Sequence, residues 1–111
     1  MNSVQFKSIL FSLLFFLPAI TFAGEIFGTI KKDGKPLAKQ EVQLVQNGKV
    51  IGSAITDANG YYSIMTKPVG KCILQLPGYE GATFEVFSTN NSTDYTLSLI
   101  KAGDKWQLKK Q

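Results

Sequence analysis

The sequence predicts an all-β protein: an antiparallel β-sandwich of seven to eight strands, preceded by a cleaved signal peptide. After residue 23, the apolar stretches are short, are rich in Ile, Val, Phe, Tyr and Thr, and end at clusters of Gly, Asn, Asp or Pro. Short strands joined by tight turns are typical of a sandwich. No stretch after residue 23 keeps helical spacing over the roughly ten residues that indicate a helix. We therefore expect one domain over residues 24–111.

Residues 1–23 have the three-part pattern of a secretory signal peptide. Lys7 is their only charged side chain, an apolar run follows it, and Thr21 and Ala23 are small residues at the two positions that signal peptidase recognises. A membrane anchor is the alternative, but the run that ends at Ala23 holds only 15 residues, and a spanning helix needs about 20. We expect cleavage after Ala23, export by the general secretory route to a periplasm or out of the cell, and no stable membrane insertion afterwards.

Eight segments are expected to form strands. In chain order they are residues 25–31, 41–46, 50–56, 61–66, 71–76, 83–88, 95–100 and, as a candidate eighth, 105–109. Alternation places every second side chain on one face, which would be buried. The residues expected on that face are Ile26, Gly28, Ile30, Val42, Leu44, Tyr62, Ile64, Cys72, Leu74, Leu76, Phe84, Val86, Tyr95, Leu97, Leu99, Trp106 and Leu108.

Turn residues separate these segments. They are Asp33-Gly34, Asn47-Gly48, Asp57 to Gly60, Pro68-Val69-Gly70, Pro77-Gly78, the polar residues 89–94, and Ala102-Gly103-Asp104. Asn47-Gly48 is a strong hairpin signal because both residues tolerate positive φ. Segment 50–56 should therefore return beside 41–46.

The charge of the chain argues against nucleic-acid binding. Residues 24–111 hold 11 lysines against 8 carboxylates, and the sequence contains no arginine. Guanidinium groups usually supply the phosphate and base contacts of nucleic-acid-binding proteins. Lysines spread along the chain in this way indicate solubility, with at most a weak attraction to anionic surfaces.

The side chains that most enzymes use are missing. Histidine is absent, and Cys72 is the only cysteine. A Ser-His-Asp or Cys-His site is therefore excluded within this chain, and zinc would find too few ligands. Carboxylates remain, but Asp33, Asp57, Asp94 and Asp104 stand in turns. We predict a non-catalytic protein with no cofactor and no metal site.

Cys72 allows no disulfide within the chain. It shares one strand face with Leu74 and Leu76, which predicts a small buried hydrophobic side chain. The alternative is an intermolecular disulfide, which an exported protein would permit.

Residues 57–60 read D-A-N-G and raise the question of a calcium loop. Such a loop closes with a bidentate glutamate six residues after its glycine, and here that residue is Thr66. The same residues make an ordinary turn between two strands, in which Asp57 accepts backbone N–H groups, Asn59 tolerates the turn geometry and Gly60 supplies positive φ. We therefore predict a structural turn rather than a metal site.

Taken together, the motifs resemble the carboxypeptidase regulatory-like domain, one of the prealbumin-like (transthyretin-like) β-sandwiches. The matching motifs are Gly28-Thr29-Ile30 for the first strand, Asp33-Gly34-Lys35-Pro36-Leu37 for the connector, Val42-Gln43-Leu44 for the next strand, Thr56-Asp57 with Gly60, Tyr62 and Ile64 for the T-D-x-x-G-x-Y-x-I signature, and Pro68-Val69-Gly70 for the following turn. Cys72 stands where the family commonly has an aromatic residue. The segment from Tyr95 to Lys110 is similar to the last two strands of small exported stand-alone members.

This resemblance implies a Greek-key sandwich and says less about function. In larger proteins such domains are non-catalytic accessory modules, and the fold is shared with starch-binding-like carbohydrate modules. The related hydroxyisourate hydrolases depend on histidines and an arginine that this sequence lacks.

Two hypotheses about function follow. The first is an interaction or structural module of the cell envelope that binds a protein partner through a sheet edge or through the loop that carries Tyr79. The alternative reading of Tyr79 is packing over the end of the core. The second hypothesis is carbohydrate binding through exposed aromatic side chains, for which Tyr61, Tyr79, Tyr95 and Trp106 are candidates. Tyr61 is the best of these because alternation sends it to the face opposite Tyr62.

Overall fold

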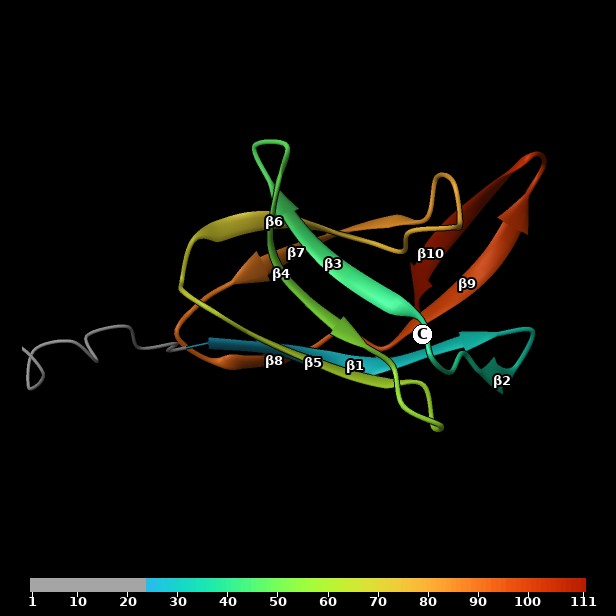
Figure 1. The fold of residues 1–111 in the computed structure, drawn as a ribbon, viewed down its shortest axis with the longest axis horizontal. Helices are drawn as coiled ribbons and strands as arrows, with labels where there is room; N and C mark the ends of the chain where they lie inside the picture. Colours follow the sequence, from blue (N-terminus) through green and yellow to red (C-terminus); the bar gives the residue numbers. More distant parts are fainter. Residues whose placement is uncertain (1–23) are drawn as a thin grey trace, which may run out of the picture.

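The computed structural model describes residues 24–111, so the predicted signal peptide lies outside the described residues. These residues form ten strands arranged in two facing sheets, and they include no helix that is long and apolar enough to span a membrane (Figure 1). The strands are β1 (Gly24–Lys32), β2 (Lys35–Pro36), β3 (Glu41–Gln46), β4 (Lys49–Ile55), β5 (Tyr61–Thr66), β6 (Gly70–Gln75), β7 (Thr83–Ser88), β8 (Ser92–Asp94), β9 (Leu97–Ala102) and β10 (Lys105–Lys110). The all-β sandwich that the sequence predicts is confirmed.

The first sheet has the strand order β4-β3-β6-β7, and all of its pairings are antiparallel. The β3–β4 hairpin turns at Asn47 and Gly48, whose φ angles are 53° and 76°. Positive φ at both central residues matches the twist of two adjoining strands. The pairing shifts by one residue between Leu44 and Val45, which leaves Ile51 as the extra residue of a β-bulge in β4.

The second sheet is built around β1. The first part of β1 pairs antiparallel with β5 and parallel with β8, and its last part pairs antiparallel with β2 and parallel with β9. A β9–β10 hairpin completes the sheet. The two parallel pairings were not foreseen, and they arise because the chain crosses from β7 in the first sheet and then runs beside β1 in the same direction. Strands β2 and β8 are too short for alternation to reveal them.

The core lies between the inner faces of the two sheets, where alternation placed it. The buried hydrophobic residues are Ile26, Ile30, Val42, Leu44, Tyr62, Ile64, Cys72, Leu74, Leu76, Ala82, Val86, Leu97, Leu99 and Leu108. Phe84, Tyr95 and Trp106 are partly buried and pack against this cluster. Burying a Val, Leu, Ile or Phe side chain stabilises a fold by about 1.5–3 kcal/mol, so this shared core holds the two sheets together.

Tyr95 joins β1 and β5 at the point where the chain passes from β8 to β9. Its N–H donates to the carbonyl of Phe27 at 2.7 Å, and its carbonyl accepts the hydroxyl of the buried Tyr62 at 2.5 Å. Gly28 pairs directly with Tyr62, and a Cβ atom on Gly28 would lie 2.3 Å from the Tyr95 carbonyl oxygen. Glycine is therefore required there for the backbones to approach.

Burial raises the pKa of Tyr62 well above its ordinary value of 10.0, and the electrostatic effect of its neighbours Asp94 and Tyr95 raises it further. The buried hydroxyl is held in its neutral form, in which it can donate to the Tyr95 carbonyl.

We predict that the free energy of unfolding falls as the pH rises above about 10. The unfolded chain then loses the Tyr62 proton while the folded chain still holds it, which favours the unfolded state. Tyr62→Phe should cost about 1–3 kcal/mol at neutral pH because the Tyr95 carbonyl loses its donor. The difference between wild type and this variant should shrink between about pH 10 and pH 11. Urea unfolding at several pH values measures it.

Tyr61→Phe is the control, because Tyr61 is exposed and directly precedes Tyr62 in the chain. This variant should unfold like the wild type at every pH. A Tyr62→Phe difference that stays constant with pH would contradict the assignment.

Candidate functional site

The turn between β4 and β5 is organised by Asp57. Its Oδ1 atom accepts the backbone N–H groups of Asn59 at 2.8 Å and of Tyr61 at 3.0 Å. Gly60 has a φ of 76°, and its carbonyl accepts the N–H of Ile30 at 2.9 Å. The Asp57 carboxylate thus shapes the backbone and anchors the start of β5 to β1. Among residues 24–111, no group of three or more His, Cys, Asp or Glu side chains is placed to hold a metal ion.

Tyr61 lies on the outer face of the second sheet. It pairs with Thr29, and its side chain is 39% exposed. Two residues away on the same face of β5, Ser63 donates its hydroxyl to Glu25, whose other carboxylate oxygen accepts Ser92 Oγ at 3.1 Å. Tyr61 therefore exposes aromatic surface on this face, and the Glu25 carboxylate, four residues farther along β1 from the Tyr61 partner Thr29, is held by two hydroxyl groups.

Tyr79 and Trp106 come together at one end of the sandwich. Tyr79 lies in the loop after β6, and Trp106 lies in β10. Their ring centroids are 5.1 Å apart, with the ring planes at 87°, which is a favourable edge-to-face geometry. The loop is fastened to β10 because the N–H of Trp106 donates to the carbonyl of Glu80 at 2.8 Å. Both aromatic side chains are partly buried and pack against the core.

Two lysines complete this group. The Nζ atom of Lys32 lies 5.2 Å from the ring centre of Trp106 and 5.6 Å from that of Tyr79, and the Nζ atom of Lys101 lies 5.5 Å from that of Trp106. Cation–π contacts at such exposed sites contribute about 0.5–1 kcal/mol. We call Lys32, Lys101, Tyr79 and Trp106 the aromatic–lysine cluster.

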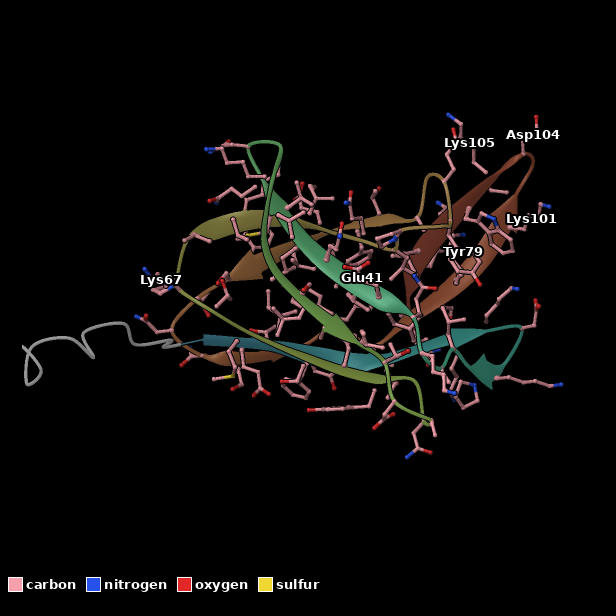
Figure 2. All side chains as sticks on the ribbon, in the orientation of Figure 1. Glu41, Lys67, Tyr79, Lys101, Asp104 and Lys105 are labelled. Atoms are coloured by element: carbon pink, nitrogen blue, oxygen red, sulfur yellow. The ribbon has the colours of Figure 1, made fainter. Side chains whose placement is uncertain are left out.

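The lysines of the aromatic–lysine cluster form no ion pair within residues 24–111, although Asp104 lies on the same β9–β10 hairpin. In the part of the chain that the structure describes, the one ion pair joins Lys71 and Glu85, at 3.0 Å. Lys101 and Lys105 lie on the β9–β10 hairpin near Tyr79, whereas Lys67 lies at the opposite end of the molecule (Figure 2). One end of the sandwich therefore combines aromatic surface with unpaired positive charge.

A different surface runs along the edge of β4. Within residues 24–111, β4 pairs only with β3. Three of its large apolar side chains are exposed: Val50 by 53%, Ile51 by 38% and Ile55 by 70%. A hollow of about 300 Å³ adjoins the bulge and is lined by Ile51, Thr66, Lys67 and Val69.

The edges of β7 and β10 are partly covered. The N–H of Phe87 in β7 donates to the hydroxyl of Tyr95 at 3.0 Å, and the N–H of Trp106 in β10 is taken by the loop carbonyl of Glu80. The outer edge of β4 has no such cover among its described neighbours, although its middle residue, Gly52, packs closely on Ile64 of β5. We call this outer edge, with Val50, Ile51 and Ile55, the β4 edge.

The structure brings together only some of the residues that the sequence singled out. Tyr79 and Trp106 are neighbours, while Tyr61 stands on the outer face of another strand. Sequence reasoning missed Lys32 and Lys101. Lys101 pairs directly with Trp106 across the β9–β10 hairpin, so hairpin register could have identified it, whereas the approach of Lys32 depends on the parallel β1–β9 pairing.

No family model matches the sequence, and no curated protein matches it. Among solved structures, a DUF3823 family protein from Parabacteroides merdae is similar at a TM-score of 0.52 and 16% identity, over 78% of this chain and 58% of that chain. A protein from Bacteroides uniformis whose description proposes carbohydrate binding is similar at a TM-score of 0.52 and 13% identity, over 81% of this chain and 54% of that chain.

These similarities show a shared β-sandwich fold. This chain spans a little more than half the length of each of the two proteins. At such low identity the structural similarities do not show membership of the carboxypeptidase regulatory-like family. The sequence resemblance to that family therefore enters only the proposal about function.

Cys72 is buried in β6 and is 1% exposed. Burial raises the pKa of its thiol, which lowers the fraction of reactive thiolate. We predict that the native protein reacts with a thiol reagent such as dithiobis(nitrobenzoate) at least about a hundredfold more slowly than the urea-unfolded protein. It should also run as a monomer on a non-reducing gel. A dimer that disappears on reduction would show that the sulfur is accessible to a second chain.

Gly60 and Gly103 offer a matched pair of substitutions. Both have positive φ, 76° and 66°, but a Cβ atom on Gly60 would lie 2.5 Å from the Ile30 carbonyl oxygen, whereas at Gly103 no atom lies within 4 Å. Gly103→Ala should cost about 1–2 kcal/mol from the backbone conformation alone. Gly60→Ala should cost at least about 1 kcal/mol more because it also clashes. Urea unfolding measures both, and equal losses would show that the turn can move away from β1.

Proposed function

We propose that this protein is a non-catalytic exported module of the cell envelope that binds an extended segment of a partner protein along the β4 edge. The observation that carries the proposal is the concentration of exposed apolar side chains on that edge: Val50, Ile51 and Ile55 all lie on one seven-residue strand.

Edge strands usually carry protection against such pairing, because their free backbone groups accept any extended chain. Charged residues, proline or a covering loop commonly provide it. β4 carries a charged residue, Lys49, at its start and a bulge at Ile51, but from Val50 to Ile55 it has neither a charged residue nor a proline. A partner segment can add its backbone hydrogen bonds to β4, and pockets for its side chains then supply specificity.

The hollow beside the β4 bulge suits one large apolar side chain of that partner segment. Its volume is about 300 Å³, and its lining combines Ile51 and Val69 with Thr66 and the chain at Lys67. The bulge turns Ile51 out of the regular β3–β4 pairing and toward this hollow. We therefore expect a partner segment that is extended and carries an aromatic or branched aliphatic residue at the corresponding position.

The non-catalytic part of the proposal rests on the chemistry of the side chains. Histidine is absent, and the one cysteine is buried. The carboxylate of Glu25 accepts hydrogen bonds from two serine hydroxyl groups, and the carboxylate of Asp57 accepts them from backbone N–H groups. The export part rests on the pattern of residues 1–23, and the resemblance to carboxypeptidase regulatory-like modules supports an accessory role beside another protein.

Carbohydrate binding is the second candidate function. It is favoured by the Tyr79–Trp106 pair at one end of the sandwich and by the exposed Tyr61 on the outer face of the second sheet. The Bacteroides uniformis protein whose description proposes carbohydrate binding shares the fold. Aromatic side chains with a few polar groups beside them are common in ligand sites.

Site-specific photocrosslinking in the native host tests the primary proposal. A benzoyl-phenylalanine in place of Val50 or Ile55 should give a defined adduct with a partner protein, because a bound segment would lie against these side chains. The same probe in place of Ile100 is the matched control, since Ile100 is 42% exposed but lies on β9 in the other sheet. Mass spectrometry of the adducts identifies the partner peptide.

A second variant links the adduct to the β4 edge itself. Ile55→Lys adds a charge of the kind that protects natural edges, and it should abolish the adduct from Val50 while leaving the free energy of unfolding, measured in urea, within about 0.5 kcal/mol of wild type. Equal adducts from all three probe positions, or an adduct that Ile55→Lys leaves unchanged, would contradict binding at the β4 edge.

A further inference from the structure

The aromatic–lysine cluster has a feature that packing alone does not explain. Two ammonium groups, those of Lys32 and Lys101, lie over one indole ring, and they come from different strands. Like charges gathered on one ring repel each other, and neither lysine forms an ion pair within the described residues. An anionic group bound beside the ring would offset this repulsion and accept charge-assisted hydrogen bonds from the ammonium groups.

The rest of the cluster indicates what carries the anion. Tyr79 and Trp106 stand at 87° to each other and form a corner of two aromatic walls. A hollow of about 360 Å³ is lined by the loop residues 75–83, and Tyr79 is the member of the cluster that lines it. A sugar ring has apolar C–H faces that pack on aromatic walls and hydroxyl groups that suit the backbone groups of a loop.

Other anionic partners fit this end of the molecule less well. Nucleic acid is disfavoured by the absence of arginine. An anionic membrane surface would be expected to receive exposed apolar side chains as well as lysines. The most exposed apolar side chains lie instead on β4 and β5, namely Ile55, Val50 and Met65. The cluster therefore favours an acidic sugar chain over a lipid surface.

We propose that the aromatic–lysine cluster binds an acidic glycan, with a sugar ring against Trp106 and Tyr79 and its uronate, sulfate or phosphate group between Lys32 and Lys101. This inference deepens the second candidate function, carbohydrate binding, by naming the chemical class of the ligand. It uses a different surface from the β4 edge and does not depend on partner binding there.

The chain carries its own probe for this proposal. Trp106 is the only tryptophan in the sequence, so any change in tryptophan fluorescence comes from the cluster. The purified protein is titrated separately with oligogalacturonate, a sulfated dextran oligomer, neutral malto-oligosaccharide, and vesicles of anionic phospholipid. Both acidic oligomers should change the emission, with an apparent Kd that rises as salt is added. The neutral oligomer should need at least a tenfold higher concentration.

Two double variants with equal loss of charge separate a built site from general attraction. Lys32→Gln with Lys101→Gln should weaken binding of the acidic oligomers at least tenfold. Lys49→Gln with Lys67→Gln removes the same two charges from exposed positions away from the cluster and should leave the Kd within about twofold. If the first double variant unfolds in urea earlier than the second, Lys101→Gln alone, at an exposed position, replaces it and should weaken binding at least threefold.

The possible outcomes are distinct. If the two double variants weaken binding equally, the binding depends only on the net charge of the protein, and the proposal is overturned. Equal binding of neutral and acidic oligomers would overturn the acidic specificity while keeping carbohydrate binding. A response to vesicles alone would assign the cluster to a lipid surface. No response to any ligand would overturn both this inference and carbohydrate binding at the cluster, and the β4 edge would be unaffected.

Discussion

The crossing between the two sheets is fixed by one residue, Tyr95, whose backbone and side chain each make a separate connection. Its N–H binds β1 at Phe27, its carbonyl accepts the hydroxyl of Tyr62 from β5, and its own hydroxyl accepts the N–H of Phe87 from β7 in the other sheet. Gly28 makes the close approach feasible because it has no Cβ atom. Since the Tyr62 hydroxyl is buried, the bond cannot be exchanged for water at small cost. The crossing from the first sheet to the second is therefore held in one geometry.

That geometry decides which surfaces remain for recognition. The hydroxyl of Tyr95 occupies part of the β7 edge, and the loop carbonyl of Glu80 occupies part of the β10 edge. The β4 edge is left with exposed apolar side chains, and the β9–β10 hairpin carries Trp106 and Lys101 to the end of the second sheet. One surface is apolar and linear, which suits an extended peptide. The other is aromatic and positively charged, which suits a compact anionic group. The two proposed ligands would therefore use different surfaces.

Much of the fold could be predicted from local patterns, and the site could not. Alternation correctly assigned the inward faces because one side of each long strand is buried, and Asn47-Gly48 correctly marked a hairpin. The outward position of Tyr61 followed from the same alternation. Pairing between distant segments could not be predicted in this way. Glu25 of β1 and Ser92 of β8, for example, are 67 positions apart in the sequence. The parallel pairings, and with them the approach of Lys32 to Trp106, depend on tertiary structure that no local pattern encodes.

The position of β1 also determines the order in which the molecule can be completed. It is the first strand of the described chain, yet its partners β8 and β9 are supplied by the last quarter of the sequence. The four strands of the first sheet, and the β1–β5 pair, can form as they emerge, whereas the other side of β1 must wait for β8 and β9. Contacts between such distant residues slow folding because a long loop must close first. The export proposed above would gain from this delay, since the second sheet cannot close until the final strands have arrived.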